Sequence, residues 1–384
     1  MGFADSLWSD PVDYLRAHQP EDPVLFLSPA ALQAQARRFL AGFPGLVTYA
    51  VKANPDETIL ANLATAGVTG FDVASPEEIA LVRRLIPGAA LHYNNPVRAR
   101  AEIAFAVAQN VTSYSVDADS ELDKLIALVP PRRASGAQTE IAVRFKLPVP
   151  GAAYDFGAKF GADEALAARL LQRVVAAGFA PALTFHPGTQ CQDPAAWEAY
   201  IRAARRIAGP IRLSRLNTGG GFPSRRQRAD APALDAIFAT IARTTFEAFG
   251  MDAPALVCEP GRAMVADSMA LAARVKALRD DGPVFLNDGI YGAFAELPSI
   301  GTPDRLSALS PEGLPRTGTP RPRVVFGPTC DSLDRLPGEP ALPEDLAEGD
   351  YLLVQGMGAY SAAIATRFNG FGAARHHLVL DLGA

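Results

Sequence analysis

The chain has 384 residues, of which 49% are hydrophobic and 20% are charged, and its formal net charge is −5. This length predicts about two domains with sizeable cores, and an acidic balance without a basic run argues against a nucleic-acid surface. No segment resembles a membrane-spanning helix, and the first residues lack the pattern of a secretory signal, so we expect a cytoplasmic protein. The cysteines lack metal-type spacing, so we expect no metal site and three reduced thiols, at Cys191, Cys258 and Cys330.

From residue 46 onward, apolar strand-like runs alternate with helical stretches. Runs 46–51 and 68–73 are followed by helical stretches 57–66 and 77–86. The same alternation continues through strand-like segments at 91–94, 112–116, 140–145, 182–186 and 212–216. This repeat predicts a parallel barrel or a doubly wound sheet, and by itself does not distinguish between them.

Beyond about residue 257 the pattern changes to strand-like segments separated by Gly and Pro turns. We expect strands within 263–275, 283–287, 323–326, 351–355 and 376–382. These segments predict a second, mostly β domain. The Pro-rich stretch 310–322 is expected to be a surface loop, because proline has no N–H to donate to a β-ladder.

One lysine, Lys52, stands at the end of the apolar run 46–51 and is followed by Asn54-Pro55. An amine desolvated at a strand end can have a lowered pKa and condense with an aldehyde, so Lys52 is a Schiff-base candidate. Taken alone, a lysine in this place is more often a solvated strand-end residue.

Five further segments follow in a fixed order: Phe71-Asp72-Val73-Ala74-Ser75, His186-Pro187-Gly188-Thr189, Gly219-Gly220-Gly221-Phe222-Pro223, Glu259-Pro260-Gly261-Arg262 and Gly327-Pro328-Thr329-Cys330-Asp331-Ser332. With the lysine segment they resemble the fold-type III pyridoxal-phosphate (PLP) decarboxylases of ornithine, lysine and diaminopimelate, distant relatives of alanine racemase. The resemblance implies an α/β fold: a (β/α)8 TIM-like barrel at 24–256, and a β-rich domain of residues 1–23 and 257–384. It also implies that the β-rich domain contributes to a dimer interface and to the active site.

The resemblance assigns roles around the cofactor. Lys52 matches the anchor, Glu259 the partner of the pyridinium nitrogen, and His186 the imidazole that stacks on the ring. Glycines allow backbone N–H groups to approach an anion, which suits Gly219, Gly220 and Gly221 to a phosphate cradle. The remaining cofactor positions are Asp72, Arg144, Thr189, Gly261, Arg262 and Tyr360, and Glu78 matches a position near the lysine. For Asp72, Glu78 and Arg144, buried ion pairs or surface positions are equally good interpretations.

The pair Cys330 and Asp331 indicates the reaction type. In ornithine-type decarboxylases this segment comes from the partner subunit; the cysteine protonates Cα after CO2 leaves, and the aspartate faces the distal amine of the substrate. The resemblance therefore implies a homodimer with shared active sites, and Lys159 and Gly358 match interface positions. Other expected substrate contacts are Tyr291, Phe368 and Glu296.

One departure limits the substrate assignment. Ornithine decarboxylases carry a second acidic residue nine positions after the tyrosine that matches Tyr291, where this chain has Ile300. Either Glu296 or Asp304 substitutes for it, or the distal end of the substrate differs from that of ornithine.

The resemblance favours conversion of L-ornithine to putrescine in polyamine biosynthesis, or of L-lysine to cadaverine. Alternatives are diaminopimelate or a substrate without the distal amine, a racemase, and a non-catalytic relative that binds a regulatory partner. The racemase tyrosine base has no convincing match. The presence of Lys52, Glu259 and Cys330 argues against a non-catalytic protein.

Overall fold

A computed structural model describes residues 7–148, 157–280, 282–373 and 376–383. The chain divides into two compact units. The barrel unit consists of Ala36–Pro223 and Pro232–Gly261, and the β-rich unit of Met1–Gln35, Ser224–Ala231 and Arg262–Ala384. For comparison, the sequence places the barrel at 24–256.

Eight parallel strands form the closed barrel of the barrel unit, and each strand pairs with its neighbour in chain order. They are β2 (Leu46–Ala50), β3 (Gly70–Val73), β4 (Ala90–Tyr93), β5 (Ser113–Val116), β6 (Glu140–Arg144), β7 (Ala180–Thr184), β8 (Arg215–Asn217) and β9 (Ala255–Cys258). Pairing of Leu46 with Val257 closes the ring. The expected TIM-like barrel is confirmed, and the strands are almost wholly buried because helices cover their outer side while side chains fill the interior.

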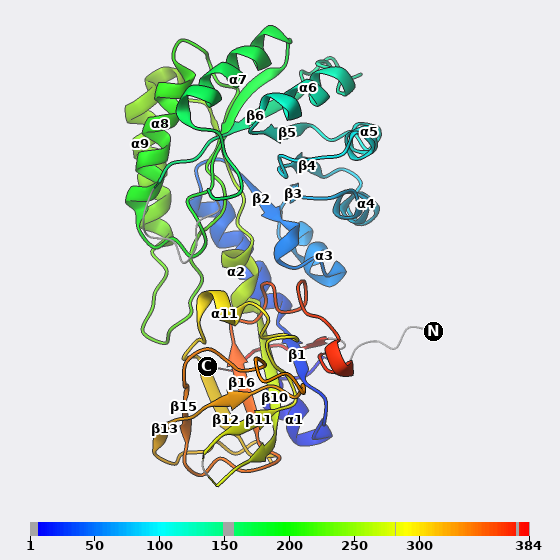
Figure 1. Cartoon of the computed structure of the whole chain (residues 1–384), viewed down its shortest axis with the longest axis vertical. Coiled ribbons are helices and arrows are strands. Elements are labelled where there is room, and N and C mark those ends of the chain that lie inside the picture. The colour runs from blue at the N-terminus through cyan, green and yellow to red at the C-terminus, as the bar shows by residue number, and fades with distance from the viewer. Residues whose placement is uncertain (1–6, 149–156, 281, 374–375, 384) are drawn as a thin grey trace. The chain divides into compact units, whose positions relative to one another are not determined.

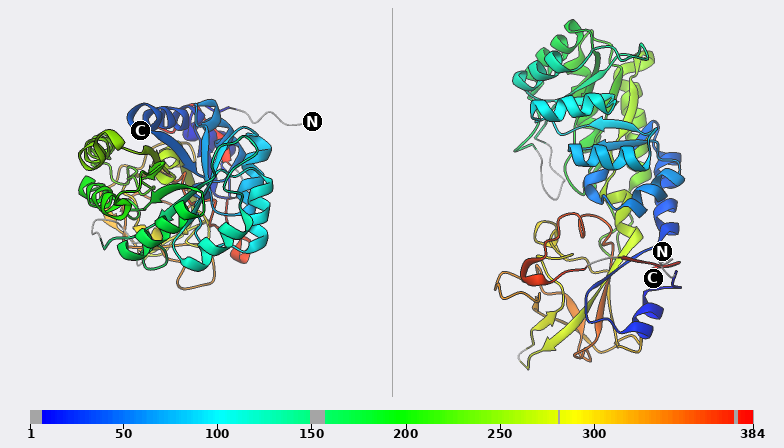
Figure 2. Two further views of the ribbon diagram at one scale, coloured as in Figure 1. Left: turned by 90° about the horizontal axis from the view of Figure 1, so that it is seen from above. Right: turned by 90° about the vertical axis from the view of Figure 1, so that its right-hand side faces the viewer.

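Helices follow the strands and surround them when the unit is seen end-on (Figure 2). Several begin at an acidic or hydroxyl residue whose side chain accepts a backbone N–H, as Asp56 and Ser75 do. The helices are α2 (Pro29–Gly42), α3 (Glu57–Thr65), α4 (Pro76–Leu85), α5 (Arg100–Ala108), α6 (Asp119–Leu128), α7 (Glu164–Ala176), α8 (Pro194–Ala208) and α9 (Leu234–Phe249). Two short 3-10 helices, η1 (Val51–Ala53) and η2 (Gly250–Asp252), follow β2 and α9.

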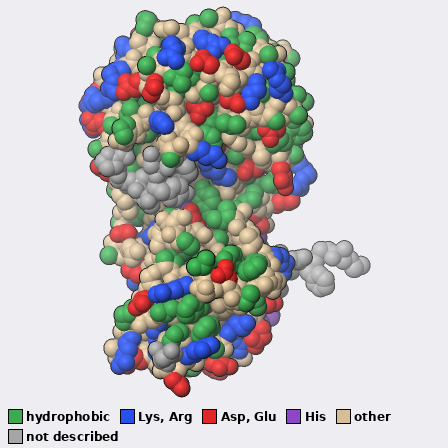
Figure 3. Space-filling model, in the orientation of Figure 1, with side chains coloured by type: hydrophobic (Ala, Val, Ile, Leu, Met, Phe, Trp, Pro, Cys, Tyr) green, Lys and Arg blue, Asp and Glu red, His purple; other side chains and the backbone are tan. Residues whose placement is uncertain are grey.

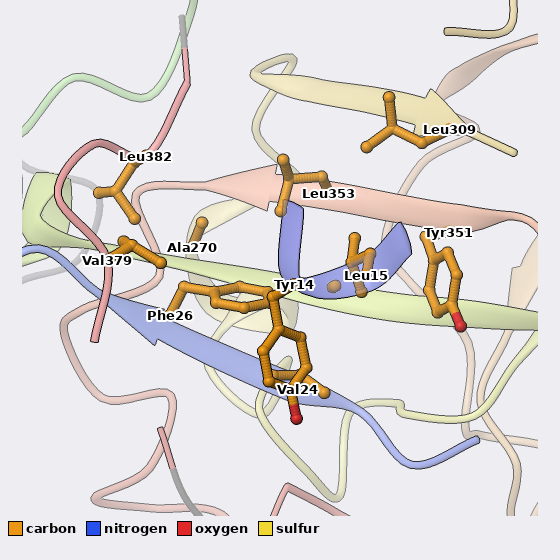
Figure 4. Packing of buried hydrophobic residues seen from close by; sticks show 11 residues of the cluster. Tyr14, Leu15, Val24, Phe26, Ala270, Leu309, Tyr351, Leu353, Val379 and Leu382 are labelled. Atoms are coloured by element: carbon orange, nitrogen blue, oxygen red, sulfur yellow. The ribbon is translucent and has the colours of Figure 1, made fainter. Parts of the chain in front are cut away.

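The β-rich unit is built on a seven-stranded sheet (Figure 1). Its main path runs β12 (Leu306–Leu309), β16 (Tyr351–Gln355), β10 (Met269–Leu278), β1 (Val24–Leu27) and β17 (His376–Leu378), and β11 (Val284–Leu286) joins β10 to β14 (Val325–Phe326). Helix α1 (Pro11–His18) packs Tyr14 and Leu15 against Phe26, Leu353 and other buried side chains of this sheet (Figure 4). The expected mostly β part of the chain is thus organised around one core.

Two segments of the β-rich unit differ from expectation. The first part of 263–275 is helical, α10 (Arg262–Val265) and η3 (Ala266–Ser268), before β10 begins. Within the expected loop 310–322, Pro320–Pro322 forms strand β13, which pairs with β15 (Ala341–Pro343). Arg321 lies between the two prolines and pairs with Leu342, so its N–H can donate to β15. Pro320 and Pro322 have no N–H, and their positions in the strand require none. The unit also contains α11 (Leu297–Ile300) and η4 (Phe368–Gly370).

Charged side chains are spread over the surface. On the face drawn in Figure 3, acidic and basic groups are interspersed with hydrophobic and other residues over the barrel unit. In the described ranges, helices are too short or too polar to cross a bilayer. The same ranges hold no cluster of three His, Cys, Asp or Glu side chains arranged for a metal ion.

Candidate active site

A cavity of about 390 Å³ lies among residues at or just beyond the carboxyl ends of the barrel strands. Because all strands are parallel, these ends meet at one mouth of the barrel. Its lining includes five of the ten predicted cofactor residues of the barrel unit: Lys52, Asp72, Arg144, His186 and Glu259. Asn94, Asn95, Lys159, Phe160 and Thr184 also line it.

Lys52 is held by its backbone and presents its side chain to the cavity. It is the middle residue of η1, and its neighbours Val51 and Ala53 are buried while Lys52 is exposed. Its positive charge opposes the effect of burial, which raises the pKa of Asp72, Glu78 and Glu259. The anchor candidate therefore has acidic neighbours, as the resemblance implies for Asp72 and Glu78, and its exposed side chain differs from the desolvated amine that the apolar run predicts.

Glu78 is fixed by the start of α4. Its carboxylate accepts the N–H of Ala74 at 2.6 Å, and the N-cap residue Ser75 accepts the N–H of Glu78 with its Oγ at 3.3 Å. Pro76 occupies the first helical position, where no N–H is needed. This local signal holds the loop after β3, and so positions Asp72 and Glu78 on the same side as Lys52.

Asp72 and Glu259 form a coupled pair of buried carboxyl groups. Burial raises the pKa of both, and the charge of Glu259 raises that of Asp72 further, to well above its usual value. The side-chain amides of Asn94 and Asn217 both donate to Glu259 Oε1. Lys52 and Arg144 also lower the pKa of Glu259, so Glu259 is the member of the pair that is more readily ionised.

His186 is a neutral imidazole. Burial, together with the charges of Lys52 and Arg144, holds its pKa well below the usual value. Its Nδ1 accepts the N–H of Gly188 at 3.1 Å, which places the ring proton on Nε2. The guanidinium of Arg144 lies 5.2 Å from the ring centre of Phe160, so one wall of the cavity is both cationic and aromatic.

The glycine run fits the phosphate cradle that the resemblance implies. A Cβ at Gly219 would stand 2.1 Å from Phe185 O, and one at Gly221 would stand 2.1 Å from Gly188 O. A Cβ at Gly220 would approach His186 Nε2 to 3.1 Å. Only glycine lets this backbone lie against the His186 loop. The N–H of Gly219 donates to Asn217 Oδ1, so the N–H groups of Gly220 and Gly221 are the ones that could reach an anion.

Neighbouring residues also suit a bound cofactor. Asp72 Oδ1 and Asn94 Oδ1 are buried without a hydrogen-bond partner among the described residues. Thr189 is buried in the loop after His186. Gly261 packs close to Lys52, since a Cβ there would be 2.9 Å from Ala53 Cβ. PLP, with an aldehyde, a phosphate and a ring nitrogen, matches this set of an amine, a glycine cradle and a carboxylate.

The other predicted residues lie in the β-rich unit and form two groups. Arg262 is ion-paired with Glu296, and its guanidinium is 5.0 Å from the ring centre of Tyr360. In the second group, the Tyr291 hydroxyl donates to Asp331 Oδ2 at 2.5 Å and the Tyr291 ring is 5.0 Å from that of Phe368.

Cys330 is exposed and contacts Asn369, whereas Cys191 and Cys258 are buried; none of the three forms a disulfide. The Glu296 carboxylate is engaged by Arg262, and Asp304 accepts the N–H of Arg228 at 2.6 Å. Gly358 lies against the Val265 carbonyl.

Sequence reasoning missed Asn94 and Asn217 and gave Lys159 only an interface role. The signal available was position, because Asn94 directly follows β4 and Asn217 ends β8, two residues before Gly219. Lys159 lines the cavity beside Phe160, with its ammonium 5.1 Å from that ring.

Comparison with known proteins agrees with this site. Residues 30–266 match the family model for the pyridoxal-binding domain of pyridoxal-dependent decarboxylases. Ornithine decarboxylase of Panagrellus redivivus is 30% identical over 94% of this chain and 86% of its own length, and lysine/ornithine decarboxylase of Selenomonas ruminantium is 34% identical over 85% and 81%. The crystal structure of the arginine decarboxylase of Paramecium bursaria Chlorella virus superposes with a TM-score of 0.83 at 27% identity, covering 95% of this chain and 97% of that one. The chain belongs to the pyridoxal-dependent decarboxylases, and it is a PLP-dependent amino-acid decarboxylase.

Proposed function

We propose that this enzyme decarboxylates a small basic L-amino acid, L-ornithine first and L-lysine next, to give the corresponding diamine. The observation that carries this proposal is the Asp331 carboxylate beside Cys330. The hydrogen bond from Tyr291 lowers the pKa of Asp331, so its side chain is an anion suited to a substrate ammonium. The named activities of the relatives, which act on ornithine, lysine or arginine, support the same substrate class.

Each residue of the cavity has a part in this reaction. Bound PLP supplies the electron sink for the electron pair that CO2 leaves behind. Lys52 would offer the amine that anchors the aldehyde, and the glycine run, with Thr189, would hold the phosphate. Glu259 keeps a proton on the ring nitrogen, because an ionised carboxylate stabilises the charged ring. Neutral His186 forms one wall without adding charge.

We further propose a homodimer in which the Cys330 segment serves the partner's cavity, where the thiol returns a proton to Cα. Large apolar side chains of the β-rich unit are exposed: Leu333, three residues after Cys330, by 71%, Phe368, next to the Cys330 contact Asn369, by 43%, and Ile364 by 47%. Exposed apolar groups around a reactive thiol suit a surface that a second copy covers. Mixed dimers of Lys52→Ala and Cys330→Ala subunits should regain up to about a quarter of wild-type activity, since one of two sites is intact in half of the molecules. No recovery on mixing would argue against a shared site.

The deciding experiment is a product assay by mass spectrometry. The purified protein with PLP is incubated separately with L-ornithine, L-lysine, L-arginine and meso-diaminopimelate, with Lys52→Ala as the inactive control. Putrescine or cadaverine is the expected product. If no amine forms from any of the four while PLP remains bound through Lys52, the basic-substrate proposal is wrong and the distal end of the substrate differs.

A further inference from the structure

Glu259 receives two hydrogen bonds from side chains on two different strand ends. Asn94 follows β4 and Asn217 ends β8, and the amide nitrogen of each donates to the same oxygen, Oε1. The second oxygen of Glu259 is used by neither amide. Glu259 itself follows β9, so three strand ends converge on one carboxylate at the wall of the cavity.

Asn217 also connects Glu259 to the glycine run. Its Oδ1 accepts the N–H of Gly219 at 2.9 Å, while the N–H of Glu259 donates to the Gly219 carbonyl at 2.9 Å. The orientation of the Asn217 amide is therefore fixed: its oxygen faces a donor, which leaves its nitrogen for Glu259. The phosphate cradle and the Glu259 carboxylate are parts of one hydrogen-bonded network.

The charges around Glu259 show why amides, and not acids, are needed at these two positions. Asp72 is a second buried carboxyl group in the same cluster, and Lys52 and Arg144 are the cations that act on Glu259. The charge of Glu259 raises the pKa of Asp72, so ionisation of Glu259 disfavours ionisation of Asp72. Asn217 and Asn94 both donate to Glu259 Oε1, while Asn94 also acts on Asp72 and lowers its pKa. Glu259 is thus served by two amide donors and Asp72 by one, which favours the ionised form of Glu259.

We propose that Asn94 and Asn217 are positioning residues that select Glu259, rather than Asp72, as the ionised carboxylate and fix its orientation. The inference rests on the proposed pairing of Glu259 with the ring nitrogen of PLP. It assigns the strength of that pairing to two neutral amides that bind the Glu259 carboxylate.

The test separates ring pairing from general cofactor affinity. Dissociation constants are measured on the full chain, freed of cofactor, for PLP and for 1-deaza-PLP, in which a C–H replaces the ring nitrogen. The aldehyde and phosphate are common to both, so the ratio of the two constants reports the ring nitrogen alone. In the wild type PLP should bind about tenfold more tightly than the carbon analogue, as expected for a charge-assisted hydrogen bond.

Two variants probe the amides. Asn217→Asp keeps an oxygen for the Gly219 N–H but replaces the donor to Glu259 with a negative charge, and Asn94→Ala removes the other donor. Each should reduce the preference for PLP by about fivefold, because Glu259 then holds a proton more often. Asn95→Ala is the matched control: Asn95 also lines the cavity, but its amide donates to Ala74 O at 3.3 Å, so it should leave the preference unchanged.

Two results would overturn the inference, and they differ. If Asn94→Ala and Asn217→Asp weaken PLP and 1-deaza-PLP equally, the amides only support the fold and the inference fails while the pairing stands. Glu259→Gln tests the pairing itself and should abolish most of the preference. If Glu259→Gln keeps the wild-type ratio, the proposed pairing fails and the inference falls with it.

Discussion

At the residue scale, the position of Asp331 bears most directly on substrate choice. Asp331 is half-buried, and its carboxylate accepts hydrogen bonds from Tyr291 at 2.5 Å and from the N–H of Leu333 at 2.9 Å. Both bonds favour the anion, and they hold it in one orientation. Glu296 is engaged by Arg262, and Ile300, which stands where ornithine decarboxylases carry a second acidic residue, lies in α11. Among the described residues that were expected to contact the substrate, Asp331 is therefore the acidic side chain that we expect to meet a substrate ammonium.

Replacing Asp331 with Asn should therefore raise KM for the preferred basic amino acid by about ten- to a hundredfold, with a smaller effect on kcat, because a charge-assisted bond becomes a neutral one. Tyr291→Phe keeps the carboxylate and removes one bond to it, so a change of only a few-fold is expected. Steady-state kinetics on L-ornithine and L-lysine measure both. An unchanged KM in Asp331→Asn would show that another group recognises the distal amine.

At the scale of elements, the turn from β8 into the glycine run depends on close approach and not only on a left-handed backbone. Gly221 has φ +81° and its added Cβ would lie 2.1 Å from Gly188 O, whereas Gly178 has φ +83° and its nearest neighbour would be 3.9 Å away. Replacing either glycine with alanine imposes the same left-handed backbone strain, but only the Gly221 substitution adds a steric clash. Gly178 is therefore the matched control for Gly221.

Gly178→Ala should reduce the free energy of unfolding by about 1–2 kcal/mol, the cost of a left-handed alanine. Gly221→Ala should cost clearly more, and should also weaken PLP binding, because the His186 loop must move away from the cradle. Urea denaturation and a PLP titration of both variants measure this. Equal losses of stability with unchanged PLP affinity in Gly221→Ala would contradict a cradle at this run.

Elements also show how far the sequence could be interpreted. The barrel strands from β2 to β8 were predictable because buried parallel strands appear as short apolar runs between turn residues. The helical turn α10 was not, since Ala263-Met264-Val265 is fully buried and a short apolar run lacks the periodicity that separates helix from strand. Asn94 and Asn217 were missed for a different reason: asparagine at a strand end looks like an ordinary turn residue, and its partner is on another strand.

At the scale of the whole molecule, the dependence of stability on pH combines buried groups of opposite sign. Burial raises the pKa of four carboxyl groups: Asp72, Glu78 and Glu259 in the barrel unit, and Asp288, to about 6, in the β-rich unit. These groups contribute stability at low pH, which is lost as the pH rises through their folded pKa values. His92 acts in the opposite direction. Burial and the charge of Arg215 lower its pKa to about 3.

His92 lies in a buried polar group inside the barrel. Its Nε2 is 3.0 Å from Arg215 Nη1, and Glu140 binds Arg215 at 3.3 Å and Ser113 at 2.8 Å. A guanidinium can only donate, so the ring nitrogen that faces Arg215 must be unprotonated. In the unfolded chain the same histidine takes up a proton near pH 6.5. Between pH 6.5 and about 3 the unfolded state therefore binds more protons, and acid favours unfolding.

The prediction is that wild-type protein loses about 2 kcal/mol more stability than His92→Gln between pH 6.5 and 4.5. The unfolded histidine is half protonated at pH 6.5, so the slope approaches about 1.4 kcal/mol per pH unit only below that pH. Glutamine keeps an acceptor for Arg215 but does not titrate, and the raised carboxylates act equally in both proteins, so the difference isolates His92. Equilibrium urea denaturation in a Trp8→Phe background follows the barrel alone, because Trp197, buried in α8, is then the single tryptophan. Parallel pH profiles for the two proteins would mean that His92 titrates alike when folded and unfolded, and that Arg215 does not hold it neutral.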